Sequence, residues 1–233
     1  MANSLPLILI PGLLCTRDLW RHQIENLSDI ADIWVPDTTR RHSIIETAQD
    51  ILAVAPTEFA LAGLSMGGYI SFEIMRREPK RIKKLALLDT NARADLPEQA
   101  ANRRLAMNQA EHGEFRGVTD TLIPNLIHPD RLDDKELVDT VKGMARDVGK
   151  DAFIRQQTAI IGRPDNRPLL PTITCPTLVV VGREDALTPP KVAQEMADGI
   201  PGAELVIIEK CGHLSTLEKP EEVTSHMRGW LTA

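Results

Sequence analysis

The sequence predicts an α/β protein: a mostly parallel, doubly wound sheet of about six strands, covered by helices on both faces. Short apolar runs alternate with helix-length amphipathic segments through residues 1–90, and the alternation returns through residues 172–233. The runs are apolar throughout, which is typical of parallel strands buried on both faces. Residues 91–171 interrupt the alternation with helical patterns. We therefore expect a core built from residues 1–90 and 172–233, with a helical insertion at 91–171.

The first half of the core contains four predicted strands with helices between them. The strand patterns lie at residues 5–10, 32–35, 59–64 and 82–89, and the helix patterns lie at 18–26, 43–54 and 66–78. The middle helix opens with Ser43 and Glu46, at the spacing of a capping box, which satisfies free N–H groups at a helix start. Pro79 ends the third helix because proline has no N–H to donate.

The insertion contains two segments, residues 137–148 and 152–161, whose apolar side chains recur at the spacing of one helical face. After the insertion, strand patterns lie at 177–182 and 204–209, and helix patterns lie at 190–198 and 220–231. The alternation of strand and helix is thus the same on both sides of the insertion, which supports a single sheet.

The composition argues against several kinds of partner. The 233 residues carry a net charge of −6, and lysine and arginine are spread along the chain, so no basic stripe is available to neutralise phosphates. Aromatic residues make up 3% of the chain and offer few stacking platforms for bases. There is no positively charged leader and no run of eighteen apolar residues. We expect a cytoplasmic protein that binds neither nucleic acid nor membrane.

Metal ions and cofactors are not expected either. The three cysteines match no zinc or disulfide spacing, which fits a reducing compartment. Five histidines have neither a partner at i, i+4 nor clustered carboxylates: His22, His42, His112, His128 and His226. The glycines around Ser65 do not indicate a dinucleotide site, because the G-x-G-x-x-G motif of such a site requires glycine where Ser65 stands.

Ser65 stands among glycines where a strand pattern gives way to a helix pattern. Gly63, Ser65 and Gly67 spell G-x-S-x-G, and Gly68 follows. At such a turn a serine is held in a strained backbone conformation with its hydroxyl at the top of the sheet, and flanking side chains would collide with neighbouring elements. The motif in this context predicts a nucleophile.

A serine hydroxyl needs a base to take its proton and, usually, a carboxylate to orient that base. His213 follows the strand pattern at 204–209, and Asp185 follows the one at 177–182. Because the carboxyl ends of parallel strands share one edge of the sheet, we expect these side chains to meet Ser65 there. Asp89 also ends a strand and stays an alternative source of the carboxylate.

With these residues in place, the chain resembles the α/β-hydrolase family from Leu5 to the C-terminus. The order Ser65, Asp185, His213 is that of the family. The resemblance implies that Ser65 is the nucleophile, His213 the base and acid, and Asp185 the orienting carboxylate. It further implies that residues 91–171 form a lid. The chain departs from the family in one respect: many members have two antiparallel strands before the first parallel one, but only four residues precede Leu5 here, so we expect about six strands.

The oxyanion hole is also assigned by resemblance. It requires two backbone N–H donors beside the reacting carbonyl. We expect them to be Leu13, in the loop Pro11-Gly12-Leu13-Leu14, and Met66, at the start of the helix pattern at 66–78, with Leu14 as an alternative to Leu13.

These residues predict a serine hydrolase that cleaves a small or medium carboxylic ester through an acyl-enzyme, without a cofactor. Carbon–carbon bond hydrolysis and peracid formation use the same residues and stay open, as does a hydrolase-fold binding protein with little turnover. The insertion has only two aromatic residues, Phe115 and Phe153, so we expect a pocket lined by leucine, isoleucine, valine and methionine that suits aliphatic acyl groups.

Overall fold

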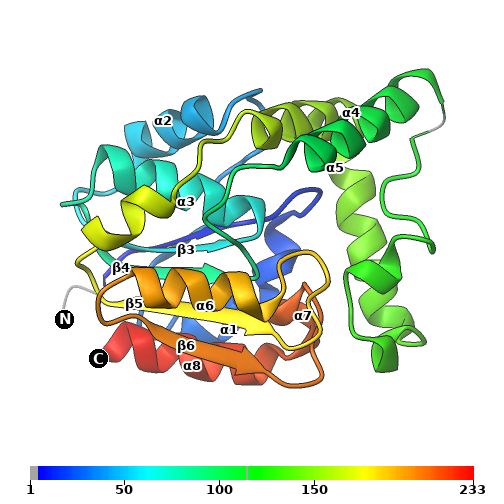
Figure 1. The fold of residues 1–233 in the computed structure, drawn as a ribbon. Coiled ribbons are helices and arrows are strands. Elements are labelled where there is room, and N and C mark those ends of the chain that lie inside the picture. The colour runs from blue at the N-terminus through cyan, green and yellow to red at the C-terminus, as the bar shows by residue number, and fades with distance from the viewer. Residues whose placement is uncertain (1–4, 114) are drawn as a thin grey trace.

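The computed structural model describes residues 5–113 and 115–233. At its centre, the described residues form a sheet of six strands in the order β2-β1-β3-β4-β5-β6, with every neighbouring pair parallel (Figure 1). The strands are β1 (Leu7–Ile10), β2 (Ile33–Trp34), β3 (Phe59–Leu64), β4 (Ile82–Leu88), β5 (Thr177–Gly182) and β6 (Glu204–Ile208). The prediction of about six mostly parallel strands is confirmed, and the sheet is parallel throughout.

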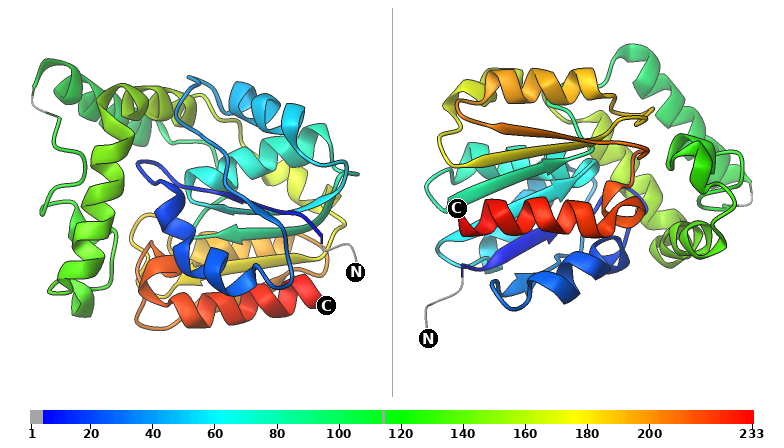
Figure 2. Two further views of the ribbon diagram at one scale, coloured as in Figure 1. Left: turned by 180° about the vertical axis from the view of Figure 1, so that it is seen from behind. Right: turned by 90° about the horizontal axis from the view of Figure 1, so that it is seen from below.

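Side chains that alternate along the strands fill two separate apolar layers. On β3, Ala60, Ala62 and Leu64 belong to one layer, whereas Phe59 and Leu61 belong to the other. Helices cover both layers, which explains why the strands are apolar throughout (Figures 1 and 2). The first layer contains residues of α1 (Arg21–Leu27) and α8 (Pro220–Thr232), and the second contains residues of α2 (Ile44–Val54), α3 (Met66–Arg77) and α6 (Pro190–Gly199).

The carboxyl ends of the strands form one edge, where the site described below lies. Ile10 on β1 pairs with Gly63 on β3, which pairs with Leu87 on β4, so the ends of these three strands are nearly level. The loops that follow β1, β3, β4, β5 and β6 therefore leave the sheet at this edge, as the sequence pattern predicted.

Between β4 and β5 the chain forms the helical insertion. Its long helices are α4 (Pro97–His112) and α5 (Lys135–Ile161), with short 3₁₀ turns at Ile123–Asn125, Pro129–Arg131 and Arg167–Thr172. Figure 1 shows most of the green insertion beyond the carboxyl edge of the sheet. The backbone of α5 is broken at Gly149, whose φ of 76° is readily adopted only without a Cβ atom.

Three details differ from the sequence prediction. Residues 137–148 and 152–161 belong to one helical element, α5, interrupted at Gly149. Helix α4 was not predicted because Ala110 is its only buried residue, so its sequence carries no apolar stripe. The short α7 (Ser215–Glu218) was not predicted either. Across the described ranges 5–113 and 115–233, no helix is both long and apolar enough to cross a membrane.

Candidate active site

Ser65 lies in the sharp turn between β3 and α3. Its φ of 54° and ψ of −114° place a residue with a side chain in a sparsely populated conformation. The flanking glycines permit the turn: a Cβ on Gly63 would lie 2.3 Å from the Gly67 carbonyl oxygen, and a Cβ on Gly67 would lie 2.1 Å from the Ile10 oxygen. Neighbouring backbone therefore occupies the space that these side chains would need.

Hydrogen bonds to the end of β4 and to the segment after it hold this turn in place. The Ser65 N–H donates to the Leu88 oxygen at 3.0 Å, and the Thr90 hydroxyl donates to the Ser65 oxygen at 2.8 Å. The same Thr90 hydroxyl oxygen would lie 2.4 Å from a Cβ on Gly68. The strain at Ser65 is thus maintained by two strands and by a helix start that must be glycine-rich.

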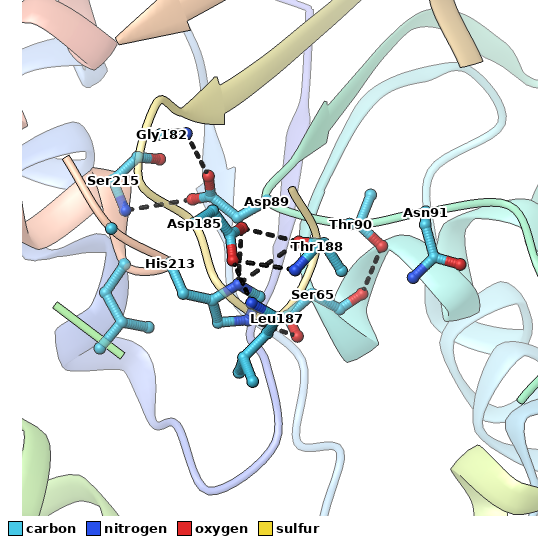
Figure 3. Close-up of polar contacts among 12 residues, drawn as sticks. Ser65, Asp89, Thr90, Asn91, Gly182, Asp185, Leu187, Thr188, His213 and Ser215 are labelled. Atoms are coloured by element: carbon cyan, nitrogen blue, oxygen red, sulfur yellow. Dashed lines mark hydrogen bonds and ion pairs between the residues drawn. The ribbon is translucent and has the colours of Figure 1, made fainter. Parts of the chain in front are cut away.

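His213 connects Ser65 to a carboxylate. Its Nε2 lies 3.0 Å from the Ser65 Oγ, and its Nδ1 lies 2.8 Å from the Asp185 Oδ2 (Figure 3). The histidine is 4% exposed, and its backbone N–H donates to the backbone oxygen of Leu126, in the insertion, at 3.0 Å. The structure therefore brings the three predicted residues into one chain of hydrogen bonds, with Nδ1 facing the carboxylate and Nε2 facing the hydroxyl.

Asp185 is fixed by the loop that follows β5. Its Oδ1 accepts hydrogen bonds from the N–H groups of Leu187 and Thr188 at 2.8 and 2.9 Å, and its Oδ2 accepts from the Thr188 hydroxyl at 2.7 Å. Burial raises the pKa of Asp185, but the charge and hydrogen bond of His213 and the Thr188 donors outweigh burial and hold this pKa below its ordinary value.

The pKa of His213 moves the other way. Burial lowers it, whereas the Asp185 carboxylate raises it through its charge and hydrogen bond, and the carboxylates of Asp89 and Glu218 raise it further. The net result is a pKa above the ordinary 6.5 of histidine. The pair thus favours a charged imidazolium next to an ionised Asp185.

Asp89, the alternative carboxylate, faces elsewhere. Its Oδ1 accepts from the Gly182 N–H and its Oδ2 accepts from the Ser215 N–H, both at 3.1 Å (Figure 3). It is fully buried, and burial together with the negative charge of Asp185 raises its pKa to about 8. Its contacts join the end of β5 to the start of α7, and the carboxylate that contacts the His213 ring is that of Asp185.

The two candidate N–H groups after β1 differ in their partners. The Leu14 N–H donates to the Gln156 side-chain oxygen at 3.1 Å, whereas none of the residues in 5–113 and 115–233 accepts a hydrogen bond from the Leu13 N–H. Met66 opens α3, so its N–H is one of those that a helix start leaves without an intrahelical partner. The N–H groups of Leu13 and Met66 are therefore available to donate, whereas that of Leu14 is already engaged.

A cavity of about 490 Å³ lies beside Ser65, and residues of the insertion form much of its wall. Part of its wall is aliphatic, as predicted, and includes Val118, Leu122, Leu126, Val141 and Met144. The prediction omitted the polar part of the wall, which contains Asn91, Gln99, Asn102, Arg103, Gln157 and Arg163. These polar residues stand in helices or loops without a recognisable motif, and neither they nor Gln156 and Thr188 gave a signal in the sequence.

No group of three or more histidine, cysteine, aspartate or glutamate side chains in the described part of the chain is arranged to hold a metal ion. Cys15 and Cys211 are buried, and burial raises the pKa of both thiols, that of Cys15 to about 12. Neither thiol forms a reactive thiolate under ordinary conditions. Ser65 is thus the nucleophilic side chain at this edge that faces a base.

The fold and this site have counterparts among known proteins. A model of the α/β hydrolase family matches residues 7–225, and the chain belongs to that family. It is 29% identical over 195 residues to a pimeloyl-[acyl-carrier protein] methyl ester esterase of Neisseria meningitidis, which covers 80% of this chain and 75% of the relative. The corresponding esterase of Nitrosomonas europaea is 25% identical over 239 residues, covering 96% of this chain and 94% of its own.

Solved structures give the same family. A thermophilic esterase from Thermogutta terrifontis, solved with malate bound, superposes with a TM-score of 0.91 at 33% identity, over 98% of this chain and 89% of that one. An enol-lactonase from Burkholderia xenovorans superposes with a TM-score of 0.89 at 24% identity, over 99% and 93%. The second likeness concerns the fold. The chain is thus an α/β hydrolase with esterases among its relatives.

Proposed function

We propose that the protein is a serine hydrolase that cleaves small or medium carboxylic esters through an acyl-enzyme. The observation that carries this proposal is the chain of hydrogen bonds from Ser65 through His213 to Asp185, in the wall of a cavity of small-molecule size. Esterase relatives at 29% and 33% identity support ester hydrolysis as the reaction.

In the first half of the reaction, Ser65 attacks the ester carbonyl carbon. His213 Nε2 takes the hydroxyl proton as the new bond forms, and the carbonyl oxygen becomes an oxyanion that the N–H groups of Leu13 and Met66 stabilise. The imidazolium then gives the same proton to the leaving oxygen as the ester C–O bond breaks. The alcohol departs, and the acyl group stays on Ser65.

In the second half, water replaces the alcohol. His213 takes a proton from the water as its oxygen attacks the acyl carbon, and returns that proton to the Ser65 Oγ when the tetrahedral intermediate collapses. Asp185 stays ionised throughout, fixes the tautomer with the proton on Nδ1, and stabilises the imidazolium.

The insertion, which we place at residues 91–171, acts as a lid in this proposal. It supplies much of the cavity wall beside Ser65, and its Leu126 oxygen accepts a hydrogen bond from the backbone N–H of His213. Exclusion of water by the lid would strengthen the electrostatic interactions that stabilise the oxyanion.

Replacement of Ser65 tests the proposal. We expect Ser65→Ala to abolish hydrolysis of p-nitrophenyl butyrate while the melting temperature stays equal or rises, because relief of a strained functional site rarely costs stability. A fluorophosphonate should add one label to the wild-type chain, on the peptide that contains Ser65. Loss of activity with the label on another residue would refute the assignment of the nucleophile.

A further inference from the structure

The polar part of the cavity wall contains two arginines, and only one carboxylate contacts them. Arg103 and Arg163 both line the cavity, and none of its described lining residues is an aspartate or a glutamate. Asp95, which lies behind the wall, contacts both guanidinium groups and is 2% exposed. One carboxylate therefore faces two cations, which leaves an excess of one positive charge beside a site of small-molecule size.

Arg163 is the deeper of the two, with a side chain 2% exposed. Its Nη1 donates to the Asp95 Oδ1 at 2.6 Å and to the Ile160 oxygen at 3.1 Å, and its Nε donates to the Arg93 oxygen at 3.0 Å. Its Cζ lies 4.1 Å from the centroid of the Tyr69 ring. Within residues 5–113 and 115–233, no acceptor is bonded to its Nη2, so a buried guanidinium keeps two N–H donors for another partner.

Arg103 completes the polar end in the same way. Its Nε donates to the Asp95 Oδ2 at 2.7 Å and its Nη1 donates to the Gln157 side-chain oxygen at 2.9 Å. No residue in the described ranges accepts a hydrogen bond from its Nη2. Each guanidinium therefore keeps an Nη2 with N–H donors, and a carboxylate is the kind of acceptor that guanidinium groups bind best.

The position of Arg103 and Arg163, which form the polar end of the cavity, indicates which half of an ester they face. Tyr69 follows Ser65 by one turn of α3, a rise of about 6 Å, and its hydroxyl accepts a hydrogen bond from the Asn91 side chain at 3.3 Å. In Figure 3, Asn91 and His213 lie on opposite sides of Ser65. Since His213 protonates the leaving alcohol, the alcohol lies toward His213 and the acyl chain extends toward Asn91 and Arg163.

We propose that Arg163 and Arg103 bind a carboxylate at the far end of the substrate's acyl chain, so that the preferred substrates are half-esters of short dicarboxylic acids. The inference rests on the proposed ester hydrolysis and adds the substrate class. The aliphatic wall would contact the methylene groups between the two ends of the acyl chain, and the carboxylate would neutralise the excess charge at the polar end.

The test compares monoethyl glutarate with ethyl valerate, which has the same acyl length and a methyl group in place of the carboxylate. Products are quantified by chromatography. We expect the wild-type protein to favour the half-ester in kcat/KM, and Arg163→Gln to lower the ratio of the two values by about 10- to 100-fold, the effect of losing hydrogen bonds to a charged group. Arg103→Gln should lower the ratio in the same direction.

A matched control is Arg93→Gln. Arg93 lies in the loop between β4 and α4, two residues before Asp95, but does not line the cavity, and its guanidinium donates to both carboxylate oxygens of Glu195. Its replacement should leave the ratio unchanged. If Arg163→Gln fails to fold, the double variant Asp95→Asn/Arg163→Gln removes both buried charges together. A further test needs only the wild-type protein: glutarate should inhibit its hydrolysis of ethyl valerate competitively, and more strongly than the neutral glutaramide does.

Distinct outcomes separate the two proposals. The carboxylate site would be overturned if the wild-type ratio of kcat/KM, half-ester over ethyl valerate, is 1 or less and Arg163→Gln does not change it. Ser65-dependent cleavage of ethyl valerate would still support the proposed function. Preference for 3-(pentanoyloxy)propanoate, which carries its carboxylate on the alcohol half, would overturn the placement of the acyl chain. Failure to cleave any of the three esters would refute the proposed function itself.

Discussion

The hydrogen bond between His213 and Asp185 gives the proposed activity a defined pH dependence. Neutral His213 is the active base, and its pKa lies above 6.5 because Asp185 outweighs burial. We therefore expect kcat/KM to rise with pH through a midpoint above 6.5. Asp185→Asn should move the midpoint to lower pH, because burial lowers the pKa of His213 and the Asp185 charge would no longer raise it. The same variant should lower kcat by about 10³- to 10⁴-fold.

Asp89→Asn is the comparison for that variant. Asp89 also raises the pKa of His213 through its charge, but it makes no hydrogen bond to the ring and binds the N–H groups of Gly182 and Ser215 instead. Its replacement should shift the midpoint less and cost far less in kcat. An exchange of these two behaviours in pH-rate profiles would show that Asp89 is the carboxylate partner.

Gln156 is a second residue whose role can be measured. Its buried side-chain oxygen accepts the Leu14 N–H, and its side-chain nitrogen lies 3.4 Å from the Thr38 oxygen. Gln156→Leu leaves the Leu14 N–H unpaired, which should cost about 1–3 kcal/mol of unfolding free energy. The loop that carries the Leu13 N–H should loosen, so kcat should fall more than KM rises. Steady-state kinetics with an unchanged kcat would contradict this role for the loop.

These residues differ in how far the sequence could predict them. Ser65, Asp185 and His213 were found because each follows a recognisable strand pattern, and in parallel sheets that position fixes where the side chain lies. Gln156, Thr188 and Arg163 sit in ordinary contexts and reach the site only through the packing of the insertion and loops, which a single sequence does not encode in any local pattern.

At the scale of elements, the crossing of β1 with α3 depends on Gly67. A Cβ there would lie 2.1 Å from the Ile10 oxygen, and backbone cannot move aside as a flexible side chain can. We expect Gly67→Ala to lower the unfolding free energy by about 3 kcal/mol or more, as other overpacked sites do. Urea denaturation at constant pH measures the change.

Gly229→Ala is the matched control because Gly229 also lies in a helix, α8, with no atom within 4 Å of the added Cβ. There the substitution should raise stability by about 0.5–1 kcal/mol, the usual gain in helix propensity. Equal effects at the two positions would mean that the close approach of β1 and α3 does not constrain residue 67.

Helices were predictable where one face is buried, because apolar residues then recur at helical spacing in the sequence. α2, α3, α6 and α8 each place an apolar face on the sheet, and the sequence predicted all four. α4 buries only Ala110, so no period reveals it, and the break in α5 at Gly149 depends on a backbone angle rather than on a pattern of side chains.

At the scale of the whole molecule, Glu218 joins the insertion to the core. Its Oε2 accepts the His128 N–H of the insertion at 2.6 Å, its Oε1 accepts the Gly212 N–H beside His213 at 2.9 Å, and its own backbone oxygen accepts from Arg131 at 2.6 Å. The carboxylate is 1% exposed. Two parts of the chain that the sequence separates by 90 residues are thus held by one buried acceptor.

Glu218→Gln should therefore weaken both parts at once. One glutamine oxygen can replace one carboxylate oxygen, but the amide NH₂ would face a backbone N–H donor, which should cost about 1–3 kcal/mol of unfolding free energy. Because the insertion also holds the backbone of His213 through Leu126, we expect kcat to fall as well. Hydrogen exchange should become faster at residues 126–131 and at 211–214 together. Faster exchange at only one of these segments would show that the insertion and the histidine loop open independently, and that Glu218 does not couple them.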